Sequence, residues 1–253
     1  MDLLTGTLAV VGGFAAGMIN TLAGNGSAIT LSIMTELLGL PANIANGTNR
    51  VGVLTQCWAA SISFVRNGKV DIKTTKWPIV FAVLGAVIGI WVAVSVSNEQ
   101  FKNVFKYILV LMLLVILIKP KRWLIEHSVD PNMSLWITGP LFFALGFYGG
   151  FIQMGMGVLF LVTTVLILKY NLIRANALKT VVIAVYSVLA VFLFHWHGYI
   201  DWKVGLTIAF GQTIGGYITA EIASKHPGIE IWAYRLLVFS IVAAICSVFG
   251  LFR

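Results

Sequence analysis

The chain has 253 residues, of which 59% are hydrophobic and 10% are charged, and its mean hydropathy is +0.94. This balance excludes a soluble globular domain and indicates an integral membrane protein surrounded by the lipid bilayer. The net charge of +8 does not indicate nucleic-acid binding, because the basic residues lie between apolar runs, where lysine and arginine set membrane orientation.

Ten apolar runs follow in chain order. The first five lie at about 3–22, 28–40, 44–65, 77–96 and 104–118, and the second five at about 135–152, 157–168, 175–194, 204–222 and 231–252. A helix needs about 20 residues to cross a bilayer, so the second and seventh runs are short. Short apolar segments at matching places in two halves are typical of a transporter binding site.

The two halves also share sequence. At a displacement of 130 residues, Asn46 corresponds to Asn176 and Asp71 to Asp201. Each half contains five runs, an odd number, so the second copy should be inverted relative to the first. We therefore predict an all-α integral membrane protein with two inverted-topology repeats of about five helical segments each. The first repeat covers 1–120, a cytoplasmic linker 121–133 and the second repeat 134–253.

The distribution of basic residues predicts the orientation. If the loop after the third run is cytoplasmic, that side receives Arg66, Lys69, Lys73, Lys76, Lys119, Lys121, Arg122, Lys169, Arg174 and Lys225. The opposite side receives only Lys102, Lys106, Lys203 and Arg253. The excess of positive charge on the cytoplasmic side predicts ten membrane segments with both termini periplasmic. Re-entrant hairpins in place of the short runs would lower the number of spans but keep the inversion.

The apolar pattern is interrupted by Gly24 to Ser27 in the first half and by Gly155 to Gly157 in the second. Glycine lets the backbone leave helical geometry, and irregular backbone at membrane depth is tolerated where protein or a water-filled cavity satisfies its polar groups. We predict non-helical breaks in broken or re-entrant helices that meet near mid-membrane and line a cavity. The alternative is that the glycines allow close helix packing and the polar side chains bond between helices.

Short motifs recur along the chain in a fixed order. They are GFAAG at 13–17, GNGS at 24–27, LGLP at 38–41, ANGT at 45–48, GKVD at 68–71, and Gly85 followed by Gly89. In this order the motifs resemble the TauE/SafE family of sulfite and organosulfonate exporters over nearly the whole chain. The second half departs from that pattern, with Ala177-Leu178-Lys179 in place of Gly-Thr and Gln153 to Met156 in place of much of the glycine-rich break.

The resemblance implies a multi-pass carrier of the bacterial inner membrane that moves a small sulfur-containing anion, driven by an ion gradient, with proton or sodium as the coupling ion. It implies neither a cofactor nor a metal. We expect a secondary transporter that works by alternating access. An anion channel using the same cavity is the alternative. An intramembrane enzyme is the third class, although the chain lacks Gly-x-Ser-x-Gly and His-Glu-x-x-His.

The candidate substrate site combines polar side chains with two cations. Asn46, Asn49 and Arg50 share one face of a helical third run, and Asn176 and Lys179 share a face of the eighth. Two cations would then flank one anion, with further donors from backbone N–H groups after each break. The candidate residues are Asn20, Gly24, Asn25, Gly26, Ser27, Asn46, Thr48, Asn49, Arg50, Gln153, Gly155, Gly157, Asn176 and Lys179.

Several of these residues have a second interpretation. Arg50 and Lys179 can instead extend to opposite membrane interfaces, and Gln153 can instead bond between helices. Glu36 and Glu221 are either proton carriers or interfacial acids. His195 and His197 are two residues apart without a cysteine or carboxylate cluster, which does not predict a metal site.

Overall fold

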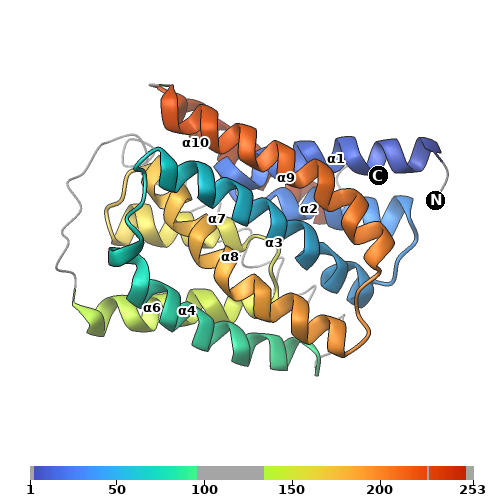
Figure 1. The fold of residues 1–253 in the computed structure, drawn as a ribbon, viewed down its shortest axis with the longest axis horizontal. Helices are drawn as coiled ribbons and strands as arrows, with labels where there is room; N and C mark the ends of the chain where they lie inside the picture. The colour runs from blue at the N-terminus through green and yellow to red at the C-terminus, as the bar shows by residue number, and fades with distance from the viewer. Residues whose placement is uncertain (1–2, 96–133, 227, 249–253) are drawn as a thin grey trace.

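The computed structural model describes residues 3–95, 134–226 and 228–248, and the regular structure in these ranges is entirely helical (Figure 1). The first half contains α1 (Leu3–Ala23), α2 (Gly26–Ser32), the π-helical turn η1 (Ile33–Leu37), α3 (Ala42–Arg66) and α4 (Ile72–Ala93). The second half contains α6 (Leu135–Phe151), α7 (Met156–Val162), the π-helical turn η3 (Thr163–Ile167), α8 (Leu172–Trp196), α9 (Trp202–Lys225) and α10 (Ile229–Val248). The predicted run 104–118, the predicted linker 121–133 and the basic residues that they carry lie outside the described residues.

The two halves contain the same kinds of element in the same order. The elements of the first half have 21, 7, 5, 25 and 22 residues. Their counterparts from α6 to α9 have 17, 7, 5, 25 and 24 residues. Each short apolar run is therefore a two-turn helix that continues into a π-helical turn, a local widening that is often found at functional sites.

The first break folds α1 and α2 into a helical hairpin. A Cβ atom added to Gly26 would lie 2.0 Å from the carbonyl oxygen of Ala16, and one added to Gly12 would lie 2.2 Å from Cδ1 of Ile33. The segment after the break therefore returns along α1 toward the side from which α1 came. The returning limb, residues 26–37, is shorter than the about 20 residues that a full span needs.

Closely packed glycines join helices of different halves. In α1 and α9 these are Gly13, Gly17, Gly211 and Gly215, and in α4 and α6 they are Gly85, Gly89, Gly146 and Gly150. A Cβ atom at Gly146 would lie 1.9 Å from the carbonyl oxygen of Ala82, and one at Gly211 would lie 2.0 Å from that of Val10. Glycines four residues apart let helix backbones approach this closely. The first helix of each half thus packs against the other half: α1 against α9, and α6 against α4.

The two 25-residue helices α3 and α8 lie between these pairs and run antiparallel. Gly47, near the start of α3, packs against the Phe194 ring near the end of α8. By contrast, α9 runs parallel to α3: the backbone N–H of Asp201 donates to Thr48 Oγ1 near one end, and Ser63 bonds Glu221 near the other. The buried polar residues concentrate on α3 and α8 in the middle of the bundle.

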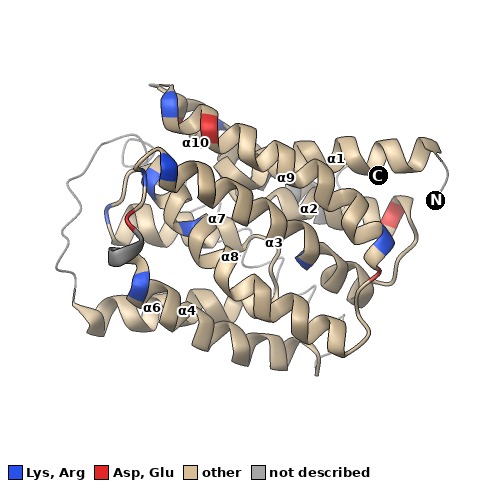
Figure 2. Cartoon of the chain, in the orientation of Figure 1, with Lys and Arg blue, Asp and Glu red and all other residues tan. Residues whose placement is uncertain are grey.

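The helices carry the apolar surface of a multi-pass membrane protein. Within the described ranges, three helical stretches are long and apolar enough to cross a membrane: Leu3–Ala23, Thr75–Ala93 and Leu172–Trp196. The sequence predicts ten membrane segments, of which the second and the seventh are short. Among the other described helices, α2 and α7 are too short to cross a bilayer, and the asparagine-containing α3 is less apolar. Large apolar side chains such as Trp91 and Phe210 are exposed, and Figure 2 shows most charged residues at the two ends of the bundle.

Candidate functional site

Each half has a helix break where the sequence predicts one. The helix α1 ends at Ala23 and α2 begins at Gly26, and Gly24 has φ +76°. In the second half α6 ends at Phe151, α7 begins at Met156, and Gly155 has φ +74°. Glycine adopts these left-handed values without steric cost, which is why it stands at both positions. The non-helical prediction is therefore confirmed at Gly24, Asn25 and Gly155.

The same prediction is wrong at Gly26, Ser27, Met156 and Gly157, which are helical. The chain reverses within a few residues, and the backbone N–H of Ala28 already donates to the carbonyl of Asn25 at 3.2 Å. The next helix therefore starts sooner than the run of small residues suggests. Gly26 and Gly157 serve close packing instead, Gly26 against α1 and Gly157 against the other break.

The two breaks touch each other. A Cβ atom added to Gly24 would lie 2.3 Å from the carbonyl carbon of Gly157, and one added to Gly157 would lie 2.3 Å from Cα of Gly24. Backbone therefore packs on backbone between the first break and the first turn of α7, which directly follows the second break. The sequence predicts this meeting of the breaks, while its depth in a membrane stays a prediction.

Arg50 projects from α3 to the end of α6. Its side chain is completely buried. Nη1 donates to the carbonyl of Gly149 at 2.7 Å and to Gln153 Oε1 at 2.7 Å, and Nη2 donates to the carbonyl of Gly150 at 2.9 Å. The guanidinium carbon also lies 5.0 Å from the centroid of the Phe194 ring. A cation is favoured at the C-terminal end of a helix, where carbonyls lack helical partners.

Lys179 makes the reciprocal contact. It projects from α8 to the end of α1, and Nζ donates to the carbonyls of Asn20 at 2.8 Å and Thr21 at 3.1 Å, and to Asn176 Oδ1 at 2.5 Å. Asn176 itself donates to the carbonyl of Leu22 at 3.0 Å. Each half therefore supplies a buried cation that caps the broken first helix of the other half. The alternative in which both cations extend to the membrane interfaces is wrong, because both are buried.

Gln153 is held in an uncommon backbone conformation. Its φ is +61°, which few non-glycine residues adopt. Its side chain is buried and accepts a hydrogen bond from Arg50 of α3. This contact is the hydrogen bond to another helix that the second interpretation of Gln153 expects. Strained backbone of this kind persists where the surrounding structure fixes it, and it often marks a functional site.

The amides of the first half form a network around α3. Asn49 Oδ1 accepts from Thr30 of α2 at 2.6 Å. Asn20 donates to Gln56 Oε1 at 2.8 Å, and Gln56 Nε2 donates in turn to Thr21 Oγ1 at 3.1 Å. Neither Gln56 nor Thr30 is among the residues predicted from the sequence. A signal for Gln56 was available, because it follows Asn49 by seven residues and so lies on the same face of α3.

Not every candidate residue belongs to this centre. Thr48 is buried but accepts from Asp201 at the start of α9, which makes it a link between helix ends. Asn46 is only partly buried. Glu36 is exposed, and Thr35 lies 3.5 Å from its carboxylate. Among the described residues no cluster of three or more metal-ligating side chains occurs.

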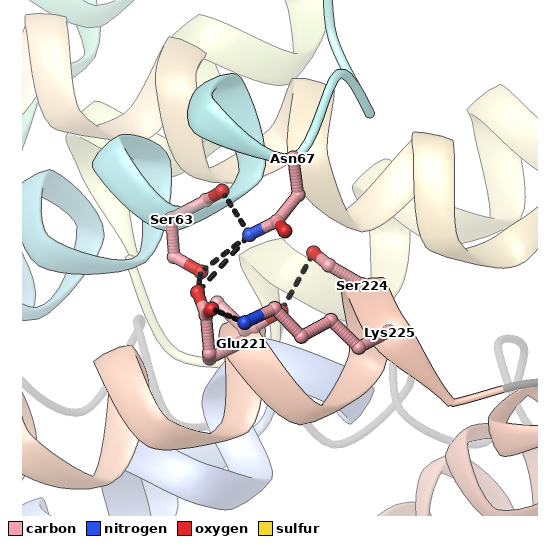
Figure 3. A network of polar contacts seen from close by, with 6 residues as sticks. Ser63, Asn67, Glu221, Ser224 and Lys225 are labelled. Carbon is pink, nitrogen blue, oxygen red and sulfur yellow. Dashed lines mark hydrogen bonds and ion pairs between the residues drawn. The ribbon is translucent and has the colours of Figure 1, made fainter.

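Glu221 belongs to a separate polar cluster at the end of α3 and α9 (Figure 3). Ser63 donates to its carboxylate at 2.5 Å and Asn67 at 3.0 Å, and Lys225 forms an ion pair with it at 2.5 Å. The cluster joins Glu221 to the end of α3, on the side where Arg66 ends that helix and Lys69 follows in the loop. Glu221 is therefore committed to an interhelical contact at a helix end.

The chain is similar in sequence to known membrane proteins over most of its length. Residues 9–249 match the family "Sulfite exporter TauE/SafE". The probable membrane transporter protein ORF9 of Sinorhizobium sp is 30% identical over 237 residues, which cover 93% of this chain and 89% of that protein. A probable membrane transporter protein of Haemophilus influenzae is 28% identical over 211 residues, covering 83% of this chain and 82% of its own.

The probable membrane transporter protein YfcA of Escherichia coli K12 is 27% identical over 224 residues, covering 87% of this chain and 81% of its own. No solved structure gives a significant match. The family match spans nearly the whole chain, and all three relatives are named as transporters. The chain therefore belongs to the TauE/SafE family and is a membrane transporter, not an enzyme.

Proposed function

We propose that this chain is a secondary transporter that moves sulfite, a related sulfur oxyanion or an organosulfonate across the bacterial inner membrane by alternating access. The observation that carries the proposal is the chemical setting of Arg50. Its guanidinium is completely buried, and its hydrogen-bond partners in the described part of the chain are all neutral. A buried cation without a counter-charge is costly, and a bound anion would supply that charge.

Unused donors beside Arg50 support an oxyanion as the ligand. Arg50 Nε and Asn49 Nδ2 are buried and have no hydrogen-bond partner among the described residues. Buried donors without partners are rare, and they are accounted for where a ligand or an ordered water completes them. A sulfite or sulfonate group presents three oxygens to such donors, and hydrogen bonds to an anion are the stronger ones.

Lys179 has a different part in this proposal. An ammonium group has three N–H donors, and all three have acceptors in Asn20, Thr21 and Asn176. Lys179 therefore adds positive charge to the centre while it holds the end of α1. Arg50, which keeps Nε unused, is the cation we assign to direct contact with the anion.

The arrangement of the halves supports alternating access between inverted repeats. The equivalent helices α3 and α8 run antiparallel, as inversion requires, and each supplies the cation that caps the other half. The cations and the touching glycines lie where the two halves meet, so a relative movement of the halves would change access to this centre. With the basic loop after α3 in the cytoplasm, both termini are periplasmic.

Transport by purified protein in liposomes tests the function. Saturable sulfite flux that is stimulated by sulfite on the trans side would support a carrier, whereas non-saturating flux without trans-stimulation would show a channel. Arg50→Lys should reduce flux at least tenfold below saturation, because lysine keeps the charge but lacks the planar fork that serves several acceptors. Lys203→Gln, which removes an exposed cation of α9, is the matched control. Unchanged flux in Arg50→Lys would remove Arg50 from the site.

A further inference from the structure

A tyrosine outside the candidate set lies beside Arg50. Tyr186 is on α8, its side chain is completely buried, and its hydroxyl has no hydrogen-bond partner among the described residues. A buried hydroxyl without a partner is unfavourable, and phenylalanine would fill the same space without that cost. The presence of the hydroxyl therefore requires an explanation.

Tyr186 and Arg50 approach the same residue of α6. Arg50 donates to the carbonyl of Gly149 at 2.7 Å. A Cβ atom added to Gly149 would lie 2.5 Å from the Tyr186 hydroxyl oxygen and 3.0 Å from Cζ, so the missing side chain of Gly149 leaves the room that the phenol occupies. The phenol and the guanidinium therefore both reach Gly149. A neutral donor and a cation thus meet at the end of α6.

We propose that Tyr186 is a further substrate-binding residue, whose hydroxyl donates a hydrogen bond to one oxygen of the sulfur oxyanion that Arg50 binds. This inference rests on the proposed function and extends it to the second half of the chain. Sulfur oxyanions present several oxygens, so one can accept from Arg50 Nε–H while another accepts from Tyr186. The anion would then be bound by α3 of one half and α8 of the other.

Equilibrium binding to the purified full-length protein tests the inference, with sulfite and methanesulfonate as the probes. Tyr186→Phe should raise the Kd for both anions about tenfold. The control Tyr217→Phe removes an exposed hydroxyl from α9 and should leave Kd unchanged. The thermal unfolding temperature without anion should not fall in Tyr186→Phe, because the lost hydroxyl has no protein partner.

The outcomes separate the two claims. If the wild-type protein binds neither anion, the proposed function fails and the role of Tyr186 fails with it. If the wild-type protein binds and Tyr186→Phe binds equally well, only the role of Tyr186 is refuted. A Tyr186→Phe protein that unfolds at a lower temperature with unchanged Kd would show a structural role for the hydroxyl, and this result also overturns the inference.

Discussion

Gly24 and Gly157 lie back to back, with the backbone of each occupying the place where a side chain of the other would be. A Cβ atom on either would come within 2.3 Å of the other. Gly24 lies in the first break, and Gly157 lies in the first turn of α7, directly after the second break. The contact joins two residues that belong to different halves of the chain.

We expect Gly24→Ala to destabilise the protein strongly. The substitution places a side chain at φ +76°, which costs about 1–2 kcal/mol, and forces it into Gly157, which adds about 1–3 kcal/mol. Gly39→Ala is the control, because Gly39 has φ +66° but nothing within 4 Å. Thermal unfolding in detergent should show a larger decrease of the unfolding temperature for Gly24→Ala than for Gly39→Ala. Equal decreases would mean that Gly24 and Gly157 are not in tight contact.

The glycine contacts between α4 and α6 predict a difference in stability between two further alanine variants. Gly146→Ala should destabilise the protein, since its Cβ would meet the backbone of Ala82 at 1.9 Å. Gly12→Ala should have a smaller effect, although its Cβ would lie 2.2 Å from Ile33, because that atom ends a side chain that can rotate away. Both glycines are helical, so helix propensity is matched. The measurement is the unfolding temperature of each variant. A larger decrease in Gly12→Ala than in Gly146→Ala would contradict the close packing of α4 against α6.

Lys179→Met should lower the stability of the protein, because Lys179 caps the end of α1. Methionine keeps the apolar stem but leaves the carbonyl of Thr21 without its partner, at about 1–3 kcal/mol, while the carbonyl of Asn20 keeps the hydrogen bond from the Gly24 N–H. Lys203→Met, which changes an exposed lysine at the start of α9, should be nearly neutral. Hydrogen exchange of α1 is the direct measurement. We expect faster exchange near residues 20–24, and unchanged exchange there would rule out the capping role.

Reporter fusions test the orientation. Lys69 follows the end of α3, and Tyr199 packs against Gly47 near its start, so the two loops lie at opposite ends of that helix. Alkaline phosphatase, which is active only in the periplasm, should be inactive when fused after Lys69 and active when fused after Tyr199. A cytoplasmic fluorescent reporter should give the reverse. Activity after Lys69 would invert the proposed topology.

The sequence predicts helix positions well because their signals are local. Apolar runs and glycines placed the described helices within a few residues, and Gly24 and Gly155 correctly marked the breaks. The partners of the cations were not predictable in this way. Gly149 and Gly150 bind Arg50 through backbone carbonyls, which every residue has, so residue type gives no signal. Only the fold decides which helix end faces the guanidinium.

The π-helical turns illustrate the same limit. Thr30 to Leu37 and Phe160 to Ile167 are compatible with continuous helix by composition, and nothing in either stretch marks the wider turn. Equally, the hydroxyl of Tyr186 is significant only because Gly149 lies beside it. Such features depend on packing between segments far apart in the chain, which a single sequence does not encode in a readable pattern.

The reciprocal caps also impose an order on biosynthesis. Arg50 leaves the ribosome 99 residues before Gly149, and the Asn20 carbonyl waits for a lysine 159 residues later. Until then the nascent first half carries an uncapped helix end and a guanidinium without its hydrogen-bond acceptors, within the lipid or the insertion machinery. The first half therefore cannot reach its final structure alone. A truncation after residue 133 should be degraded, and co-expression of residues 134–253 as a separate chain should rescue it.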